Sequence, residues 1–270
     1  MQLVQQTISK LKGFKEWLDT LPLHESQLVL GLSGSVKHLA QSCAFEKLDK
    51  QLVIVTPTLL QATQTYEELS EWYDDEVVHL FPVEESLAAD FSVVSPDVVS
   101  QRIRTLDFLS RGQKGIIIVP LSGIQKLLVP AKVWKKSSIE LAMGSEIESM
   151  DAFVEQLVEL GYRRENMVAT PGEFALRGSI VDIYPLDQEY PLRLDFFDTE
   201  VDSIRAFNAE TQRSMDVINE VRILPATDLP LQKEAVWKAQ AKIHALYEKD
   251  VKAAQSEERK DQVANIQQAI

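Results

Sequence analysis

The residues that come nearest to a catalytic pattern lie at positions 31–38. A phosphate-binding loop has the pattern G-x-x-x-x-G-K-[ST], stands between a buried strand and a helix, and places backbone N–H groups around the phosphates. Gly31 and Lys37 fit the pattern and Gly34 lies between them, but Val36 stands where the pattern requires glycine. His38 stands where the pattern requires the hydroxyl that holds Mg²⁺. The segment therefore predicts a degenerate phosphate loop.

Both departures disfavour the binding of a nucleotide and its Mg²⁺ ion. The β-branched side chain of Val36 restricts the backbone and blocks the close approach of its N–H groups to phosphate. Imidazole is a poor ligand for Mg²⁺, which prefers oxygen. The strand expected at 115–119 ends in Pro120-Leu121-Ser122 and not in an acidic pair. We therefore expect no catalytic residue, no metal site and no cofactor in this chain. The competing interpretation, an ATP-dependent DNA-remodelling enzyme, depends mainly on Lys37.

A second candidate site consists of arginines. Lysine is absent between Lys136 and Lys233, so every basic residue in that interval is an arginine. These are Arg163, Arg164, Arg177, Arg193, Arg205, Arg213 and Arg222. Arginine is enriched at protein–protein contacts, where lysine is depleted, and its planar fork matches carboxylates. The set predicts a docking surface, whereas for any single arginine an internal ion pair is the alternative.

Charge and composition limit the kind of partner. The 270 residues include 28 Lys+Arg and 41 Asp+Glu, a formal net charge of −13, which disfavours a protein that wraps nucleic acid. With 45% hydrophobic residues the chain is globular, and its single cysteine excludes an internal disulfide. Residues 141–230 carry 7 basic and 18 acidic side chains. Because the arginines are isolated cations in an acidic region, we expect them to pair with a protein surface and not with the phosphates of a nucleic acid. No signal peptide or membrane-length apolar run is present in these residues, and we expect a cytoplasmic location without membrane contact.

Apolar runs that alternate with amphipathic helices predict a parallel sheet covered on both faces in the first part of the chain. The expected strands are 27–32, 51–58, 77–82 and 115–119, and the expected helices are 3–21, one from 36, one from 59 capped by Thr58, and 97–111.

The pattern changes after about residue 130 to short, half-polar strands, which predict an antiparallel sheet with one solvated face. The expected elements are a helix at 150–160, strands at 167–170, 174–177, 179–184, 192–197, 201–207 and 221–225, and a helix from 232 to the end. The predicted fold class is α/β, in which a parallel-sheet domain of degenerate P-loop NTPase type is interrupted by a smaller α+β domain. The predicted domains are residues 1–125, an inserted domain at 126–212, and a return to the first domain at 213–270.

Three segments carry a resemblance to a known family: residues 31–37, residues 53–58, and above all residues 161–214. Together they resemble the amino-terminal part of the Mfd family of bacterial transcription-repair coupling factors, which is similar to the excision-repair helicase UvrB. The resemblance implies a RecA/UvrB-like domain interrupted by a domain that binds UvrA. It also implies an adaptor that recruits excision repair to RNA polymerase stalled at DNA lesions.

The resemblance implies further that this chain is a fragment without enzyme activity. ATP and Mg²⁺, and contacts to RNA polymerase and DNA, would belong to an ATP-driven translocase and other parts of a longer protein. The carboxyl-terminal region of that protein would mask the UvrA-binding surface. A purely autoinhibitory structural domain stays open as an alternative.

The family's UvrA-contacting positions carry over to Arg164, Arg177, and Arg193 with Asp195, and Arg163 and Glu173 are expected neighbours. One further arginine of the UvrB pattern falls at Ala175, which puts that contact in doubt. The aromatic-rich hairpin with which UvrB closes on DNA has no counterpart in the sequence at 81–96, which is short of tyrosines. The resemblance therefore implies protein docking without a grip on damaged DNA.

Overall fold

The computed structural model describes residues 7, 11–23, 26–83, 95–230 and 233–256. The chain divides into two compact units, residues 1–229 and 230–270, which are described separately. The predicted counterpart of the DNA-closing hairpin falls largely at residues 84–94, outside the described residues.

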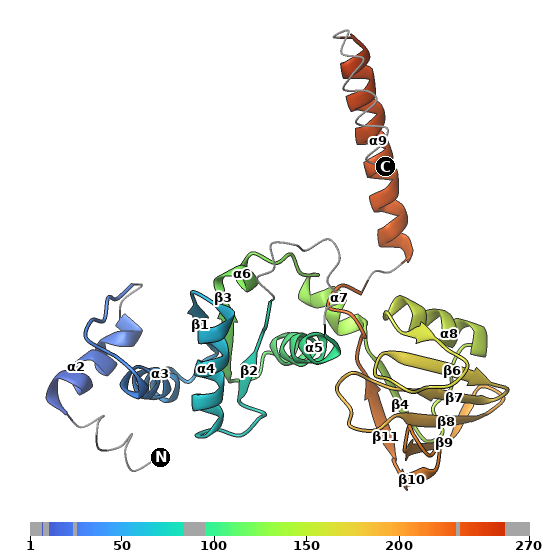
Figure 1. The fold of residues 1–270 in the computed structure, drawn as a ribbon, viewed down its shortest axis with the longest axis horizontal. Helices are drawn as coiled ribbons and strands as arrows, with labels where there is room; N and C mark the ends of the chain where they lie inside the picture. Colours follow the sequence, from blue (N-terminus) through green and yellow to red (C-terminus); the bar gives the residue numbers. More distant parts are fainter. Residues whose placement is uncertain (1–6, 8–10, 24–25, 84–94, 231–232, 257–270) are drawn as a thin grey trace. The chain divides into compact units, whose positions relative to one another are not determined.

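The first part of unit 1 is built on a three-stranded parallel sheet with the strand order β1-β3-β2 (Figure 1). Its elements are α2 (Lys12–Thr20), η1 (Leu21–Leu23), α3 (Ser35–Leu48), β1 (Leu52–Thr56), α4 (Leu59–Ser70), β2 (Val78–Leu80), α5 (Pro96–Arg111), β3 (Ile116–Pro120), α6 (Leu121–Ile124) and α7 (Ala131–Lys136). All five residues of the central strand β3 are buried, as an apolar run in a parallel sheet requires. The predicted parallel sheet is confirmed.

Local sequence signals explain where these helices begin and end. The hydroxyl of Thr58 accepts a hydrogen bond from the Gln61 backbone N–H and caps α4, as predicted. Gly112 follows α5 with a φ of 69°, in the left-handed region that suits glycine at a helix end.

The second part of unit 1 contains a six-stranded sheet with the order β10-β9-β8-β7-β6-β5. Its elements are β4 (Ile139–Ala142), α8 (Met150–Glu159), β5 (Arg163–Arg164), β6 (Glu173–Arg177), β7 (Ile180–Ile183), β8 (Leu192–Phe197), β9 (Glu200–Phe207), β10 (Ser214–Val217) and β11 (Glu220–Ile223). The pairs from β6 to β10 are antiparallel, whereas β5 runs parallel to β6. The predicted antiparallel sheet is confirmed.

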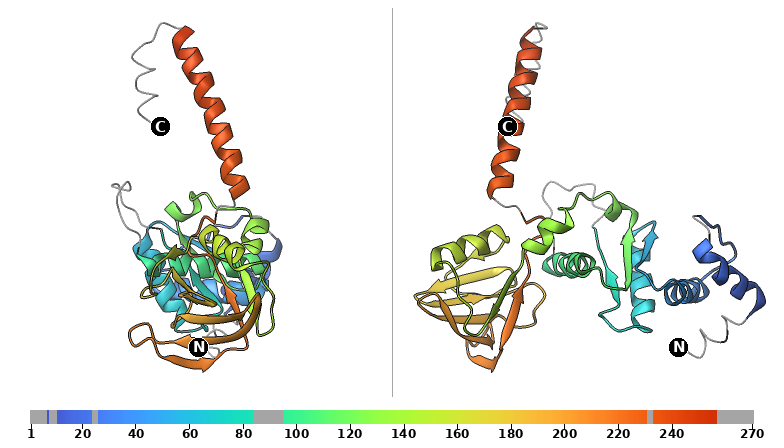
Figure 2. Two further views of the ribbon diagram at one scale, coloured as in Figure 1. Left: turned by 90° about the vertical axis from the view of Figure 1, so that its right-hand side faces the viewer. Right: turned by 180° about the vertical axis from the view of Figure 1, so that it is seen from behind.

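One face of this sheet packs on α8, which lies across it in two views (Figures 1 and 2). The core between them joins Phe153 and Leu157 of α8 to Phe174, Leu194 and Ile204 of the strands. The outer face carries the alternate residues of each strand, most of them polar, with a small apolar cluster that includes Ala175 and Phe207.

Two predicted strands are wrong. Residues 26–30 form no regular secondary structure, and Leu28 and Leu30 are largely exposed, because within the described residues no strand of the sheet pairs with them. Residues 167–170 form a loop, although Val168 is fully buried. The short strands β4, β5 and β10 and the helices α6 and α7 carry weaker sequence signals and escape prediction.

Buried ion pairs join the parallel-sheet part of unit 1 to the end of its antiparallel part. Arg102 Nε of α5 lies 2.8 Å from Asp228 Oδ2, and Lys126 Nζ lies 3.1 Å from the same oxygen. Arg222 Nη1 of β11 lies 2.8 Å from Asp107 Oδ1 of α5. A small apolar cluster, which includes Ile103 of α5 and Leu224, packs beside these charges.

Unit 2 contains α9 (Lys233–Ser256), a single helix of 24 residues. The predicted helix is thus confirmed for the residues that the structure describes. None of the helices described is both long and apolar enough to span a bilayer.

Replacement of Asp228 tests the ion pairs that join the two parts of unit 1. Asp228→Ala leaves the buried guanidinium of Arg102 without its carboxylate, which is costly in a poorly solvated site. We expect the free energy of unfolding to fall by about 3 kcal/mol. Urea denaturation followed by circular dichroism measures it.

Asp19→Ala is the matched control, because Asp19 forms an exposed pair with Lys47. We expect no measurable change in stability for this variant. Equal losses in the two variants would contradict the assignment of the buried pair.

Candidate protein-docking site

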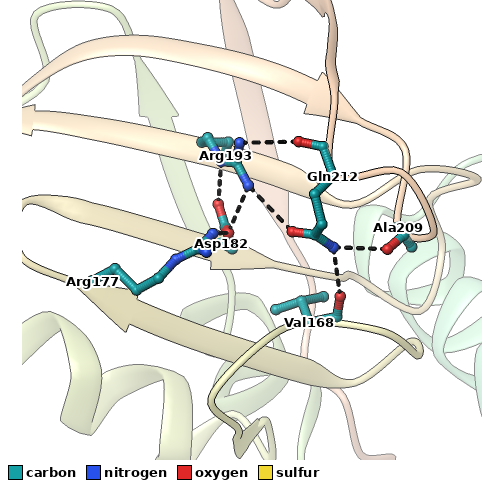
Figure 3. A network of polar contacts seen from close by, with 6 residues as sticks. All are labelled: Val168, Arg177, Asp182, Arg193, Ala209 and Gln212. Atoms are coloured by element: carbon teal, nitrogen blue, oxygen red, sulfur yellow. Dashed lines mark hydrogen bonds and ion pairs between the residues drawn. The ribbon is translucent and has the colours of Figure 1, made fainter.

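The outer face of the six-stranded sheet brings two of the predicted arginines together. Strand alternation places Arg177 of β6 and Arg193 of β8 on this face, on either side of β7. Asp182 of β7 lies directly opposite Arg193 in register and is fully buried. The three side chains converge in Figure 3.

The carboxylate of Asp182 binds both guanidinium groups. Arg193 donates from Nε to Asp182 Oδ1 at 2.6 Å and from Nη2 to Oδ2 at 2.9 Å, a bidentate pair. Arg177 donates from Nη2 to the same Oδ2. The hydrogen bonds to Asp182 raise the pKa of Arg193 above its usual value. A buried carboxylate that sequence reasoning missed therefore organises the site.

Arg193 is further fixed by its surroundings. Its guanidinium carbon lies 4.5 Å from the ring centre of Phe207, within the range of a cation–π contact. The side chain of Gln212 donates to the carbonyls of Val168 and Ala209 and lies 3.5 Å from Arg193 Nη2 (Figure 3). Gln212 has a φ of 59°, a left-handed conformation that is rare for this residue type. These contacts tie Arg193 to two loops on the outer face.

Arg177 and Arg193 differ in how much of each side chain is exposed to solvent. The side chain of Arg177 is 47% exposed, whereas that of Arg193 is 20% exposed. The internal ion pair and a docking role are therefore compatible for Arg177, because about half of its side chain stays exposed.

Arg163 and Glu173 form a second group at the end of the sheet. They are directly paired in register between β5 and β6, and Arg163 Nη2 lies 3.7 Å from Glu173 Oε1. Glu173 also accepts hydrogen bonds from the backbone N–H groups of Ala169 and Thr170, each at 2.9 Å. Burial raises the pKa of Glu173, but these hydrogen bonds and the Arg163 charge outweigh it, and the net pKa is lowered. Glu173 thus holds the loop at 165–172 in place.

Of the remaining positions, Arg164 lies on the other face of the sheet, whereas Asp195 and Ala175 lie beside the Asp182 group. Arg164 pairs in register with Phe174, a core residue, so alternation places Arg164 on the opposite face from Arg177 and Arg193. Asp195 lies two residues beyond Arg193 on β8, and its Oδ1 is 3.4 Å from Ser179 Oγ. Ala175, where the UvrB pattern has an arginine, is buried in a small cluster with Phe207 and Val168.

The degenerate phosphate loop keeps its junction with a helix but lacks the strand before it. Gly31 and Gly34 have left-handed φ values of 84° and 54°, and α3 begins directly afterwards. Val36 and Lys37 are exposed, whereas His38 is buried and faces α4. Its Nδ1 lies 2.6 Å from Glu68 Oε2. Within the described ranges, no group of three or more His, Cys, Asp or Glu side chains could hold a metal ion.

Asp182 leaves a weak signal in the sequence. It is the single acidic residue in the apolar run Ile-Val-Asp-Ile at 180–183. A tight turn at 178–179 would place it beside Ala175. Its contact with Arg193 depends on the β7–β8 register, which follows from an eight-residue loop, 184–191, with no distinctive turn sequence.

The chain is similar to a known protein family and to known proteins. Residues 139–229 match the family described as the UvrB interaction domain. The chain is 42% identical over 91% of its length to the transcription-repair-coupling factor of Staphylococcus epidermidis and 36% identical over 97% to that of Bacillus subtilis. These matches cover 21% and 22% of the two relatives, so the chain spans about a fifth of their length.

Titration of Glu173 gives a pH-dependent prediction. Because its folded pKa lies below the ordinary value of 4.5, its contribution to stability is complete above that value and disappears as the pH falls through the lowered pKa. We expect Glu173→Gln to lose about 1 kcal/mol of unfolding free energy at pH 7.

Urea denaturation of the wild type and Glu173→Gln between pH 3 and pH 7 measures this loss. We expect the difference between the two proteins to shrink steadily below pH 4.5. A difference that is the same at every pH would contradict the role of the ionised carboxylate.

The residues matched by the family model coincide with the six-stranded sheet. Residues 139–229 include all six strands of the antiparallel sheet and the predicted site residues on them. The resemblance to the bacterial transcription-repair coupling factors is thus confirmed along most of this chain, and residues 139–229 match the UvrB interaction domain.

Proposed function

We propose that this chain is an adaptor module that binds UvrA through the outer face of its six-stranded sheet. The observation that supports the proposal most directly is the match of residues 139–229 to the UvrB interaction domain, since that range contains the arginine-bearing face. The function follows from a likeness to UvrB. The surface with which UvrB binds UvrA would have a counterpart on this chain, and UvrA would bind it in the same way.

The charges of the face suit such a partner. Arg177 is half exposed and lies against a carboxylate that is itself buried, so its outer N–H donors can bind a carboxylate of a partner. The surrounding domain is acidic overall, which favours discrete pairing with a protein over coating of nucleic acid.

The parallel-sheet part is proposed to be a RecA/UvrB-like domain that has lost nucleotide chemistry. Three features support this: Val36 in place of glycine, the absence of a strand at 26–30, and the burial of His38 against Glu68. We propose that this chain has no enzyme activity and takes no cofactor of its own.

The role in the longer relatives is a proposal of the same kind. There, the module would recruit excision repair in the cytoplasm to RNA polymerase stalled at a lesion. An ATP-dependent translocase elsewhere in the protein would displace the polymerase, and a carboxyl-terminal region would mask the UvrA-binding face. The domain division at residues 125/126 and 212/213 also stays a prediction.

Binding of purified UvrA to this chain tests the adaptor proposal. We expect the wild type to bind, and Arg177→Ala to weaken the affinity about tenfold, because a charge-assisted contact contributes about 1.4 kcal/mol or more. Titration of fluorescently labelled UvrA measures the dissociation constants. Absence of binding by the wild type would overturn the adaptor function.

Lys132→Ala is the control for loss of one positive charge, since Lys132 is exposed on α7, away from the arginine face. Its affinity should equal that of the wild type. If Arg177→Ala also binds UvrA like the wild type, the assignment of the face is wrong although the adaptor function stands.

Isothermal titration with ATP and Mg²⁺ tests the loss of nucleotide chemistry. We expect no binding heat up to millimolar ATP, because the backbone around Val36 cannot approach the phosphates and His38 is turned toward α4. Micromolar binding that is abolished by Lys37→Ala would favour the competing interpretation of an ATP-dependent remodelling domain.

A further inference from the structure

Strand register places one more arginine beside the Asp182 group. Arg193 of β8 lies directly opposite Arg205 of β9, on the same face of the sheet. Asp182, Arg193 and Arg205 therefore form one row across β7, β8 and β9. Val217 of the edge strand β10 continues the row and is exposed.

This row has an unbalanced positive charge. The single carboxylate of Asp182 is shared between Arg177 and Arg193. Arg205 is exposed, and within the described residues no carboxylate lies within ion-pair distance of it. Asp195 is a diagonal cross-strand neighbour, at a spacing of about 7–8 Å between backbones. Like charges directly opposite each other on a sheet reduce stability, so Arg205 weakens the fold slightly where it stands.

We propose that Arg205 is a third guanidinium of the docking site, and that Asp182 positions Arg177 and Arg193 so that the three groups bind a carboxylate-bearing surface of the partner. This inference depends on the proposed UvrA-binding function and extends it. The partner groups are aspartate or glutamate side chains.

Preorganisation explains how a buried carboxylate can increase affinity for an acidic partner. Arg193 is held by two hydrogen bonds to Asp182, by the ring of Phe207 and by Gln212. A side chain that is already ordered loses little conformational entropy when it binds. Asp182 thus lowers the net positive charge of the face but fixes the geometry of its donors.

A protein is favoured over a nucleic acid as the partner of this row. A nucleic acid brings a dense array of phosphates, which the surrounding acidic domain repels. A protein brings separate carboxylates that can meet the row while its other surfaces avoid the negative field. Binding of a DNA duplex by this row in preference to UvrA would overturn the proposal.

Replacement of Arg205 separates binding from stability. We expect Arg205→Ala to have the melting temperature of the wild type or a slightly higher one, because the repulsion with Arg193 is gone. Its affinity for UvrA should fall about tenfold. Arg205→Lys, which keeps the charge but not the planar fork, should show an intermediate loss.

Three outcomes are distinct in this experiment. If Arg177→Ala weakens UvrA binding and Arg205→Ala does not, the extension to Arg205 is wrong and the proposed function survives. If wild-type protein does not bind UvrA, both fail. If Arg205→Lys loses as much affinity as Arg205→Ala, the contact is a directional one, which supports the proposal as well.

Asp182→Asn tests the positioning role by the sign of its effect. Removal of a negative charge would strengthen binding to an acidic partner if charge alone mattered. We expect weaker binding, measured at a temperature where circular dichroism shows the variant to be folded. In an Arg177→Ala/Arg193→Ala background, Asp182→Asn should change the affinity no further. Stronger binding of the single variant, or an equal loss in both backgrounds, would overturn the positioning role.

Discussion

The architecture of the candidate site depends on how the antiparallel sheet divides its two faces. One face packs on α8 through an apolar core, whereas the outer face has no helix on it among the described elements. Long polar side chains, two loops and the small apolar cluster around Phe207 fill that outer face instead. Asp182 is the point at which they meet, since its buried carboxylate binds Arg177 and Arg193. A buried carboxylate without such partners would be strongly destabilising.

The same principle recurs where the two parts of unit 1 meet. Asp107 is bound by Arg222 and by Arg111, and Asp228 by Arg102 and Lys126. In an acidic chain, each of these carboxylates is compensated locally by two cations. The buried pairs are directional, so they fix orientation as well as contributing energy. Arg222, one of the arginines of the lysine-free interval, therefore has a structural role and lies outside the docking face.

Much of the fold could be predicted because its signals are local. The strands β1 and β3 are short apolar runs with β-branched residues, and the helices α4 and α8 begin at capping residues with a suitable period behind them. The error at residues 27–32 has a physical reason. An apolar run forms a strand only beside a partner strand, and the described sheet has none there. The loop at 167–170 is held by the nearby Glu173 and by the packing of Val168 on Phe207, and the second contact is distant in sequence.

For the candidate site, the arginine-only interval and the broken phosphate loop could both be recognised from the amino-acid types, because the chemistry of guanidinium, imidazole and a β-branched side chain is local. The sequence could not separate Arg177 and Arg193, which share one carboxylate, from Arg164, which lies on the other face. It also left Asp182 unassigned and did not distinguish Arg205 from the other arginines of the lysine-free interval. Their roles depend on strand register, and a shift of one residue would move every side chain to the opposite face. Register is fixed by the packing of the whole sheet on α8, and for that reason it emerges from the folded structure.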